Sequence, residues 1–111
     1  MAAAGRRALQ IRGELPPSRR AMTPVGLARA RDLANRRMLS EETVLRMARY
    51  FLRHRGDRNA SGFNEGEPGY PSKGRQAWDG WGGDPAVREL LRWLPSIDIS
   101  YAATFKRVFG D

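Results

Sequence analysis

The stretch Ser40–Gly56, SEETVLRMARYFLRHRG, is the most strongly periodic part of this 111-residue sequence and decides its fold class. Ser40 is a good N-cap, and the two glutamates that follow it complement the positive end of a helix dipole. The apolar side chains recur at the three- and four-residue spacing of one helix face, namely Val44, Met47, Ala48 and Phe51. The pattern predicts an amphipathic helix that ends near Gly56.

A second helix is predicted just before it, over residues 24–38, because Thr23 can cap it and Pro24 suits the first helical position. About three residues separate the two helices, a spacing typical of a helix–turn–helix whose second helix enters the major groove of DNA. The alternative is an αα-hairpin with a solvated basic face.

Arginines line the faces of both helices that point away from the predicted core. They are Arg29 and Arg36 on the first helix, and Arg46, Arg49 and Arg53 on the second. We expect these five side chains to bind nucleic-acid phosphates. Little sequence specificity is expected, because neither helix places Asn or Gln to read adenine.

The basic residues are concentrated in the first half of the chain. The net charge is +8, and residues 1–56 alone contribute +9, from thirteen arginines against four acidic residues. Arginine presents a planar fork of donors that suits phosphate and carboxylate. The asymmetry indicates a nucleic-acid binder or a partner for an acidic protein surface. The alternative is that the Arg codons of a GC-rich genome account for the excess of Arg over Lys, which would explain the asymmetry between the two halves less well.

The rest of the chain is predicted as short elements around a long loop. Residues 1–22 read as a basic N-terminal arm, either a short helix or a flexible segment, and residues 23–111 as a single helical domain. The Gly- and Pro-rich residues 57–72 form the loop, before a short helix and a further helix that Asp84-Pro85 opens. The tail either begins extended or forms a helix over residues 101–109. The predicted fold class is mostly α, a small helical domain with a helix–turn–helix-like αα-hairpin.

Two tryptophans, Trp78 and Trp81, lie among glycines close to Lys73 and Arg75. We interpret them as the centre of a small core, because glycine lets the backbone approach a bulky indole. The alternative is that they stack on unpaired bases beside the two cations.

The composition argues against an enzyme. The chain has no cysteine and a single histidine, His54, and no candidate nucleophile lies beside a credible base. The acidic residues lack the spacing of a calcium-binding loop. We therefore expect no catalytic residues, no cofactor and no metal. No apolar stretch approaches the roughly 18 residues that a membrane span needs.

Residues 28–84 contain three distinctive motifs, namely ARARDLAN at residues 28–35, the Ser-capped helix that ends in Arg-His, and GYPSKGRQAWDGWGGD at residues 69–84. Together they resemble a small domain that recurs in tailed phages and prophages. That domain occurs alone, and next to or fused with head-maturation protease and other head proteins. The resemblance implies a phage context and a helical fold, and it implies no catalytic residues.

From charge and resemblance together we expect a phage-encoded basic accessory protein, virion-associated or DNA-handling. Its partner would be nucleic acid, in the first place DNA, held through the arginine-rich helical face. The alternatives are a structural protein–protein module (capsid, neck or connector component) or an inhibitor of a host protein, with the basic face on an acidic phage or host protein. Oligomers are compatible with either, and the expected location is the virion or the host cytoplasm.

Overall fold

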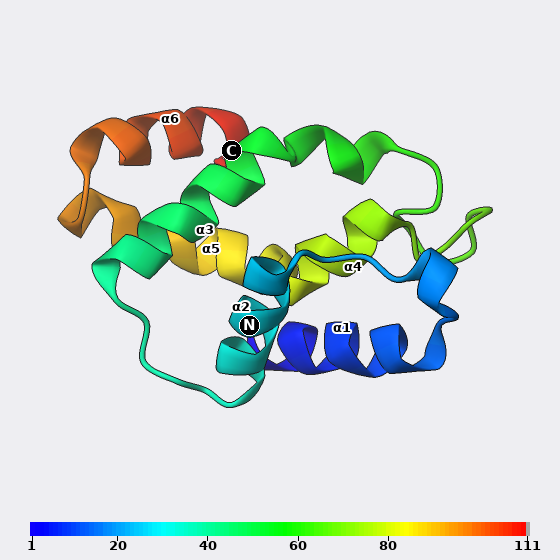
Figure 1. Ribbon diagram of the computed structural model, residues 1–111. Helices are drawn as coiled ribbons and strands as arrows, with labels where there is room; N and C mark the ends of the chain where they lie inside the picture. The colour runs from blue at the N-terminus through cyan, green and yellow to red at the C-terminus, as the bar shows by residue number, and fades with distance from the viewer. Residues whose placement is uncertain (111) are drawn as a thin grey trace.

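The computed structural model describes residues 1–110, and over these residues the fold is entirely helical (Figure 1). The prediction of a small, mostly α domain is therefore confirmed. The α-helices are α1 (Ala2–Glu14), α2 (Pro24–Ala34), α3 (Glu41–Arg53), α4 (Lys73–Gly80), α5 (Gly83–Trp93) and α6 (Ile99–Phe109). Short 3₁₀ helices span Pro17–Arg19, Arg55–Asn59 and Leu94–Ser96.

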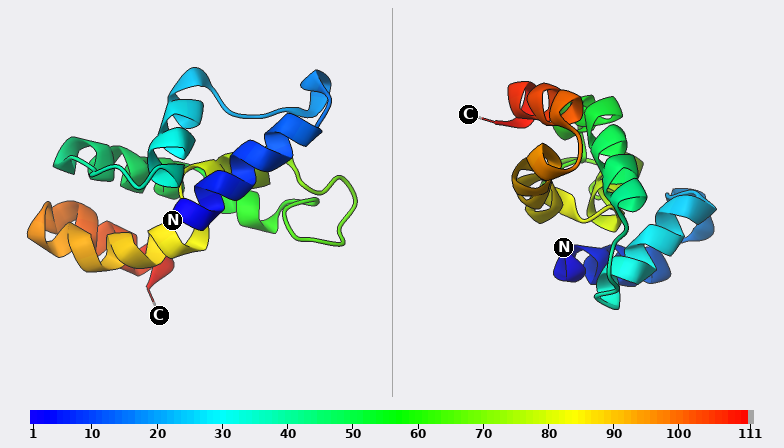
Figure 2. Two further views of the ribbon diagram at one scale, coloured as in Figure 1. Left: turned by 90° about the horizontal axis from the view of Figure 1, so that it is seen from below. Right: turned by 90° about the vertical axis from the view of Figure 1, so that its left-hand side faces the viewer.

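The short helix α4 lies between two groups of helices (Figure 2). On one side α1 and α2 pack against each other and against α4. On the other side α3, α5 and α6 pack together, and α4 contacts this group through α5 and the 3₁₀ helix after α3. The result is an elongated molecule of 41 × 29 × 19 Å with α4 near its centre.

Four of the helices begin where the sequence offers a side-chain cap. Thr23, Ser40, Ser72 and Asp98 each accept a hydrogen bond from the backbone N–H three residues further on. Such caps satisfy donors that have no partner inside the helix. The cap at Asp98 starts α6 at Ile99, so the helical alternative for the tail is the observed one.

The connection between α2 and α3 differs from the prediction. α2 ends at Ala34, because Arg36 adopts the left-handed conformation with φ 54° and the Arg37 N–H donates to the Asp32 carbonyl at 3.0 Å. This is the hydrogen bond of a Schellman ending. The chain then runs to Ser40 without helix, which leaves Met38 98% exposed rather than on the buried face.

The longer connection also changes how the two helices pack. α2 makes its contacts with α1 and α4, whereas α3 makes its contacts with α5, α6 and the following 3₁₀ helix. The helices are consecutive, as predicted, but they do not form the close pair that the helix–turn–helix interpretation requires.

The turn between α4 and α5 is tighter than the sequence indicated. α5 begins at Gly83 instead of at Pro85 after an Asp84 cap, and Gly82 and Gly83 have φ values of 111° and 65°. Glycine adopts this region without the penalty that a Cβ imposes. The Asp84 carboxylate does not cap α5; it accepts a hydrogen bond from the Trp78 indole N–H at 3.0 Å.

The N-terminal stretch forms α1, the helical option of the two that the sequence left open. α1 crosses α2 in close contact, since a Cβ on Gly5 would lie 2.9 Å from the carbonyl oxygen of Ala30. A side chain at Gly5 would therefore push the two helices apart.

Trp78 is the centre of the core, as predicted. Phe51 and Phe63 meet its ring edge-on, at centroid distances of 4.7 and 5.7 Å. Such edge-to-face pairs are favourable beyond the area they bury. The largest fully buried side chains are Trp78, Phe51, Phe105, Met47, Leu90 and Leu94. The predicted apolar face of α3 is entirely buried.

A buried carboxylate links α1 to α4. The Asp79 side chain is 4% exposed and accepts hydrogen bonds from Arg7 of α1 at 3.3 and 3.4 Å and from Arg75 of α4 at 3.1 Å. The hydrogen bond to Asp79 raises the pKa of the Arg7 guanidinium above its ordinary value. The Asp79 carboxylate thus joins two helices through charged hydrogen bonds and caps neither α4 nor α5.

Replacing Asp79 with Asn should lower the free energy of unfolding by about 2–3 kcal/mol, because two guanidinium groups lose a buried charged acceptor. Chemical denaturation followed by circular dichroism measures the change. Glu65→Gln removes the same charge in the exposed loop and should change stability by less than about 0.5 kcal/mol. Equal stabilities for the two variants would contradict the structural role of Asp79.

Replacing Arg36 with Gly should raise the free energy of unfolding by about 0.5–1 kcal/mol, because glycine adopts the left-handed conformation without the Cβ penalty. The same substitution at Arg31, an exposed position inside α2, should instead lower it by about 1 kcal/mol. A destabilised Arg36→Gly variant would contradict the left-handed turn at the end of α2.

Candidate nucleic-acid interface

Arg46, Arg49 and Arg53 lie on the exposed face of α3, where the periodicity predicts them, and we call them the arginine row. Arg46 pairs with Glu42 one turn earlier at 2.9 Å, and both side chains are at least half exposed. Exposed pairs of this kind contribute little. Arg49 lies over the Tyr101 ring of α6, 5.8 Å from its centroid. Among residues 1–110, neither Arg49 nor Arg53 has a carboxylate within ion-pair distance.

Arg29 is not on the exposed face, which corrects the sequence-based prediction. It is only 8% exposed, donates to Asp32 at 3.2 Å and lies 5.7 Å from the centroid of the Trp81 ring. Its spacing, seven residues before the exposed Arg36, predicts an exposed position, but Trp81 of the α4–α5 turn packs over the Arg29 side chain. Arg29 therefore has no surface to offer a phosphate.

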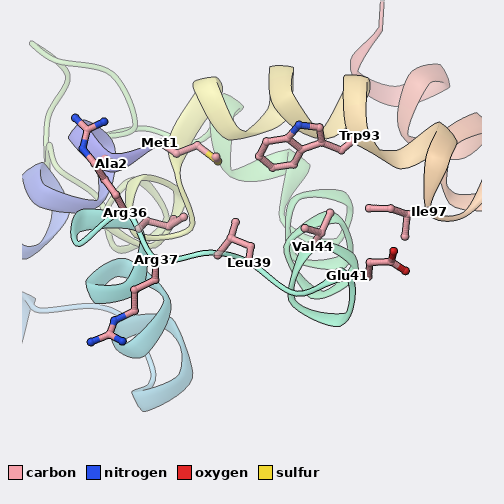
Figure 3. A pocket seen from close by; sticks show the side chains of 10 residues that line it. Met1, Ala2, Arg36, Arg37, Leu39, Glu41, Val44, Trp93 and Ile97 are labelled. Atoms are coloured by element: carbon pink, nitrogen blue, oxygen red, sulfur yellow. The ribbon is translucent and has the colours of Figure 1, made fainter.

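Arg36 is exposed, as predicted, but it lies apart from the arginine row. With Arg37 it lines a pocket of about 550 Å³ whose walls are largely apolar. Figure 3 shows the two arginines on one side of this apolar pocket, with Val44, Ile97 and Glu41 on the other and Trp93 along its top. The remaining lining residues are Met1, Ala2, Leu33 and Leu39.

A stack of flat side chains runs from α2 to the end of α3. The Trp81 ring lies between Arg29 and Tyr50, and it is parallel to the Tyr50 ring within 8° at 4.8 Å. Tyr50 in turn stacks on His54 at 4.7 Å. Trp78 is buried, and the partly buried Trp81 ring already packs against Arg29 and Tyr50. The structure thus favours the core interpretation of these residues over base stacking.

A second pocket, of about 630 Å³, lies at the end of the arginine row, and we call it the basic pocket. Its walls come from residues 20–23, from the C-terminal end of α3 and from the start of α4. Its cationic side chains are Arg20, Arg53 and Lys73. The other residues that line it are Ala21, Met22, Thr23, Tyr50, His54, Asp57, Gly74, Ala77 and Trp81. Asp57 is the carboxylate of this wall, 3.4 Å from Nδ1 of His54.

Tyr50 lines the basic pocket and carries a polar group that is unsatisfied among the described residues. Its hydroxyl is buried and has no hydrogen-bond partner in the described structure. Burial, followed by the negative charges of Asp57 and Asp79, raises the pKa of this hydroxyl well above its ordinary value. Tyr50 therefore keeps its proton at physiological pH and remains a hydrogen-bond donor.

Sequence reasoning missed Arg20 as a pocket residue and noted Lys73 only as a neighbour of the tryptophans. No local pattern marks them, because Arg20, Arg53 and Lys73 are far apart in the sequence and meet only through the packing around α4. The run SRR at residues 18–20 was one of several basic pairs in the first half, with nothing to distinguish it.

Within the part of the chain that the structure describes, no three His, Asp or Glu side chains gather as metal ligands. No helix among these residues combines the length and the apolar character needed to cross a bilayer.

Fold and surface thus define the class: a small all-helical protein with an exposed arginine row and a basic pocket. Comparison with protein family models, curated proteins and solved structures found no match. The resemblance of residues 28–84 to a phage domain stays a prediction.

Proposed function

We propose that this protein binds nucleic-acid phosphates, in the first place those of DNA, through the arginine row of α3. The supporting observation is the row itself: three exposed guanidinium groups on one face of one helix, two of them without a carboxylate partner among residues 1–110. From Arg46 to Arg53 the helix rises about 10 Å, the axial length of about three nucleotides of one strand.

Binding of this kind reads the backbone rather than the bases. Arginine grips phosphates without sequence information unless it reaches a base edge, and the row holds no amide side chain to read adenine. Such a protein suits DNA handling or packaging, where many sequences must be held. We propose it as a phage-encoded accessory protein, within the virion or the infected cell, on the resemblance given above.

The variant Arg46→Ala, Arg49→Ala, Arg53→Ala tests this function. Its affinity for a duplex should fall at low salt, and the slope of log K against log [salt] should become less steep by about 2–3, because about three counterion-releasing contacts are lost. Fluorescence anisotropy across a salt series measures both quantities, with a single strand in parallel.

The matched control is Arg31→Ala, Arg88→Ala, Arg107→Ala. These three arginines are also exposed, lie on α2, α5 and α6, and their removal changes the net charge equally. The control should bind nearly as the unchanged protein does. If both triple variants lose the same affinity and slope, total charge and not the row is responsible. Thermal unfolding of each variant checks that the fold is intact.

The apolar pocket favours a second candidate function, a structural module or inhibitor that binds an acidic protein. Its apolar walls are bordered by Arg36 and Arg37, so a partner with an apolar side chain beside acidic residues would complement it. Sedimentation without nucleic acid, at low and high salt, separates the two functions. Discrete oligomers or complexes that persist at high salt support this module, whereas a monomer that binds DNA steeply with salt supports the first function.

A further inference from the structure

The basic pocket gathers cations from three separate segments. Arg53 ends α3, Lys73 begins α4, and Arg20 precedes α2. Among residues 1–110, neither Arg53 nor Lys73 is within ion-pair distance of a carboxylate, and the Arg20 Nε donates only to the neutral carbonyl of Leu15 at 2.9 Å. Three positive charges without an ion-pair partner in the described part of the chain therefore line one pocket.

Two further features of the basic pocket are suited to an anion. Gly74 lies in the first turn of α4, so the positive end of that helix dipole faces the pocket. Tyr50 is 4% exposed, and its hydroxyl has a proton to donate and no acceptor within residues 1–110. A buried donor without an acceptor is destabilising, and it is rare unless a ligand or water completes it.

The negative charge of Asp57 would repel an anion bound in the same pocket. Its carboxylate lies against α4, where a Cβ on Gly74 would be 3.0 Å from Oδ2, and it faces His54. One negative charge against three positive ones leaves the pocket with a positive balance even when His54 is neutral. The net positive charge of the lining side chains matches a ligand with about two negative charges better than one with a single negative charge.

From this geometry we infer that the basic pocket binds a phosphate monoester, held by Lys73, Arg53 and Arg20 with the Tyr50 hydroxyl as a further donor. The Trp81 ring already packs against Arg29 and Tyr50, so we assign the pocket to the phosphate and not to an attached base. The ligand is either the terminal phosphate of a nucleic-acid strand or that of a free nucleotide. The inference extends the proposed function. It rests on that function only where the ligand is the terminal phosphate of a nucleic-acid strand.

Titration with inorganic phosphate, in the absence of nucleic acid, tests the pocket directly. Proton–nitrogen correlation spectra should shift chiefly at Lys73, Gly74 and the last turn of α3. Lys73→Ala should weaken binding about tenfold, the loss of one charge-assisted hydrogen bond. Lys106→Ala, the other lysine of the chain, is exposed on α6 and should leave binding unchanged.

Two variants of the pocket wall sharpen the test. Tyr50→Phe should weaken phosphate binding about three- to tenfold while the unliganded protein stays as stable as before or becomes more stable. Asp57→Asn should tighten binding about threefold, because it removes the opposing charge. Equal effects of Lys73→Ala and Lys106→Ala, or shifts spread evenly over the exposed arginines, would overturn the inference.

Oligonucleotides with and without a 5′-phosphate then identify the source of the phosphate. Tighter binding of the phosphorylated strand, lost in Lys73→Ala, assigns the pocket to strand ends. Phosphate binding in the pocket without any DNA binding keeps the inference and rejects the proposed function. DNA binding that depends on the arginine row but ignores inorganic phosphate, the 5′-phosphate and Lys73 rejects the inference and keeps the proposed function.

Discussion

The buried carboxylate of Asp79 is the interaction on which the arrangement of the helices depends. It lies in α4, the short helix between the two helix groups, and binds Arg7 of α1 and Arg75 of α4. A carboxylate that is almost fully buried needs such partners, because its desolvation is otherwise too unfavourable. Gly83 leaves room for it, since a Cβ there would lie 3.3 Å from Oδ1 of Asp79. The tight turn, the buried charge and the docking of α1 therefore depend on one another.

The arginines of this protein divide into internal and external groups. Arg7, Arg29 and Arg75 pair with carboxylates or pack on aromatic rings, and so belong to the architecture. In the arginine row, Arg46 makes only an exposed pair with Glu42, and Arg49 lies over Tyr101 without a carboxylate partner among residues 1–110. The cations of the basic pocket have no ion-pair partner among the same residues. Net charge alone thus overstates the surface available to an anionic partner. What supports phosphate binding is the placement of the exposed cations. The arginine row lies on α3, and its last member, Arg53, also lines the basic pocket with Arg20 and Lys73.

Most of the helical architecture follows from local patterns. The apolar spacing of α3 predicted its buried face, and Thr23 and Ser40 predicted the starts of two helices. These signals act within a few residues and are independent of the rest of the fold. The errors came where local signals competed. Asp84-Pro85 looked like a cap, but two glycines in left-handed conformations start α5 earlier and free Asp84 to bind Trp78. Arg36 ended α2 in a conformation that arginine rarely adopts, which lengthened the connection to α3.

The sequence by itself determined the fold class, the starts of α2 and α3, the buried face of α3 and the exposed arginine row, because helix periodicity and capping are local properties. Only the tertiary structure decided which arginines stay at the surface, that Asp79 joins α1 to α4, and that Arg20 and Lys73 meet Arg53 beside an unpartnered tyrosine hydroxyl. The physical reason is that these contacts join residues remote in sequence. Their burial and charge depend on which helices pack together, and no periodicity encodes that.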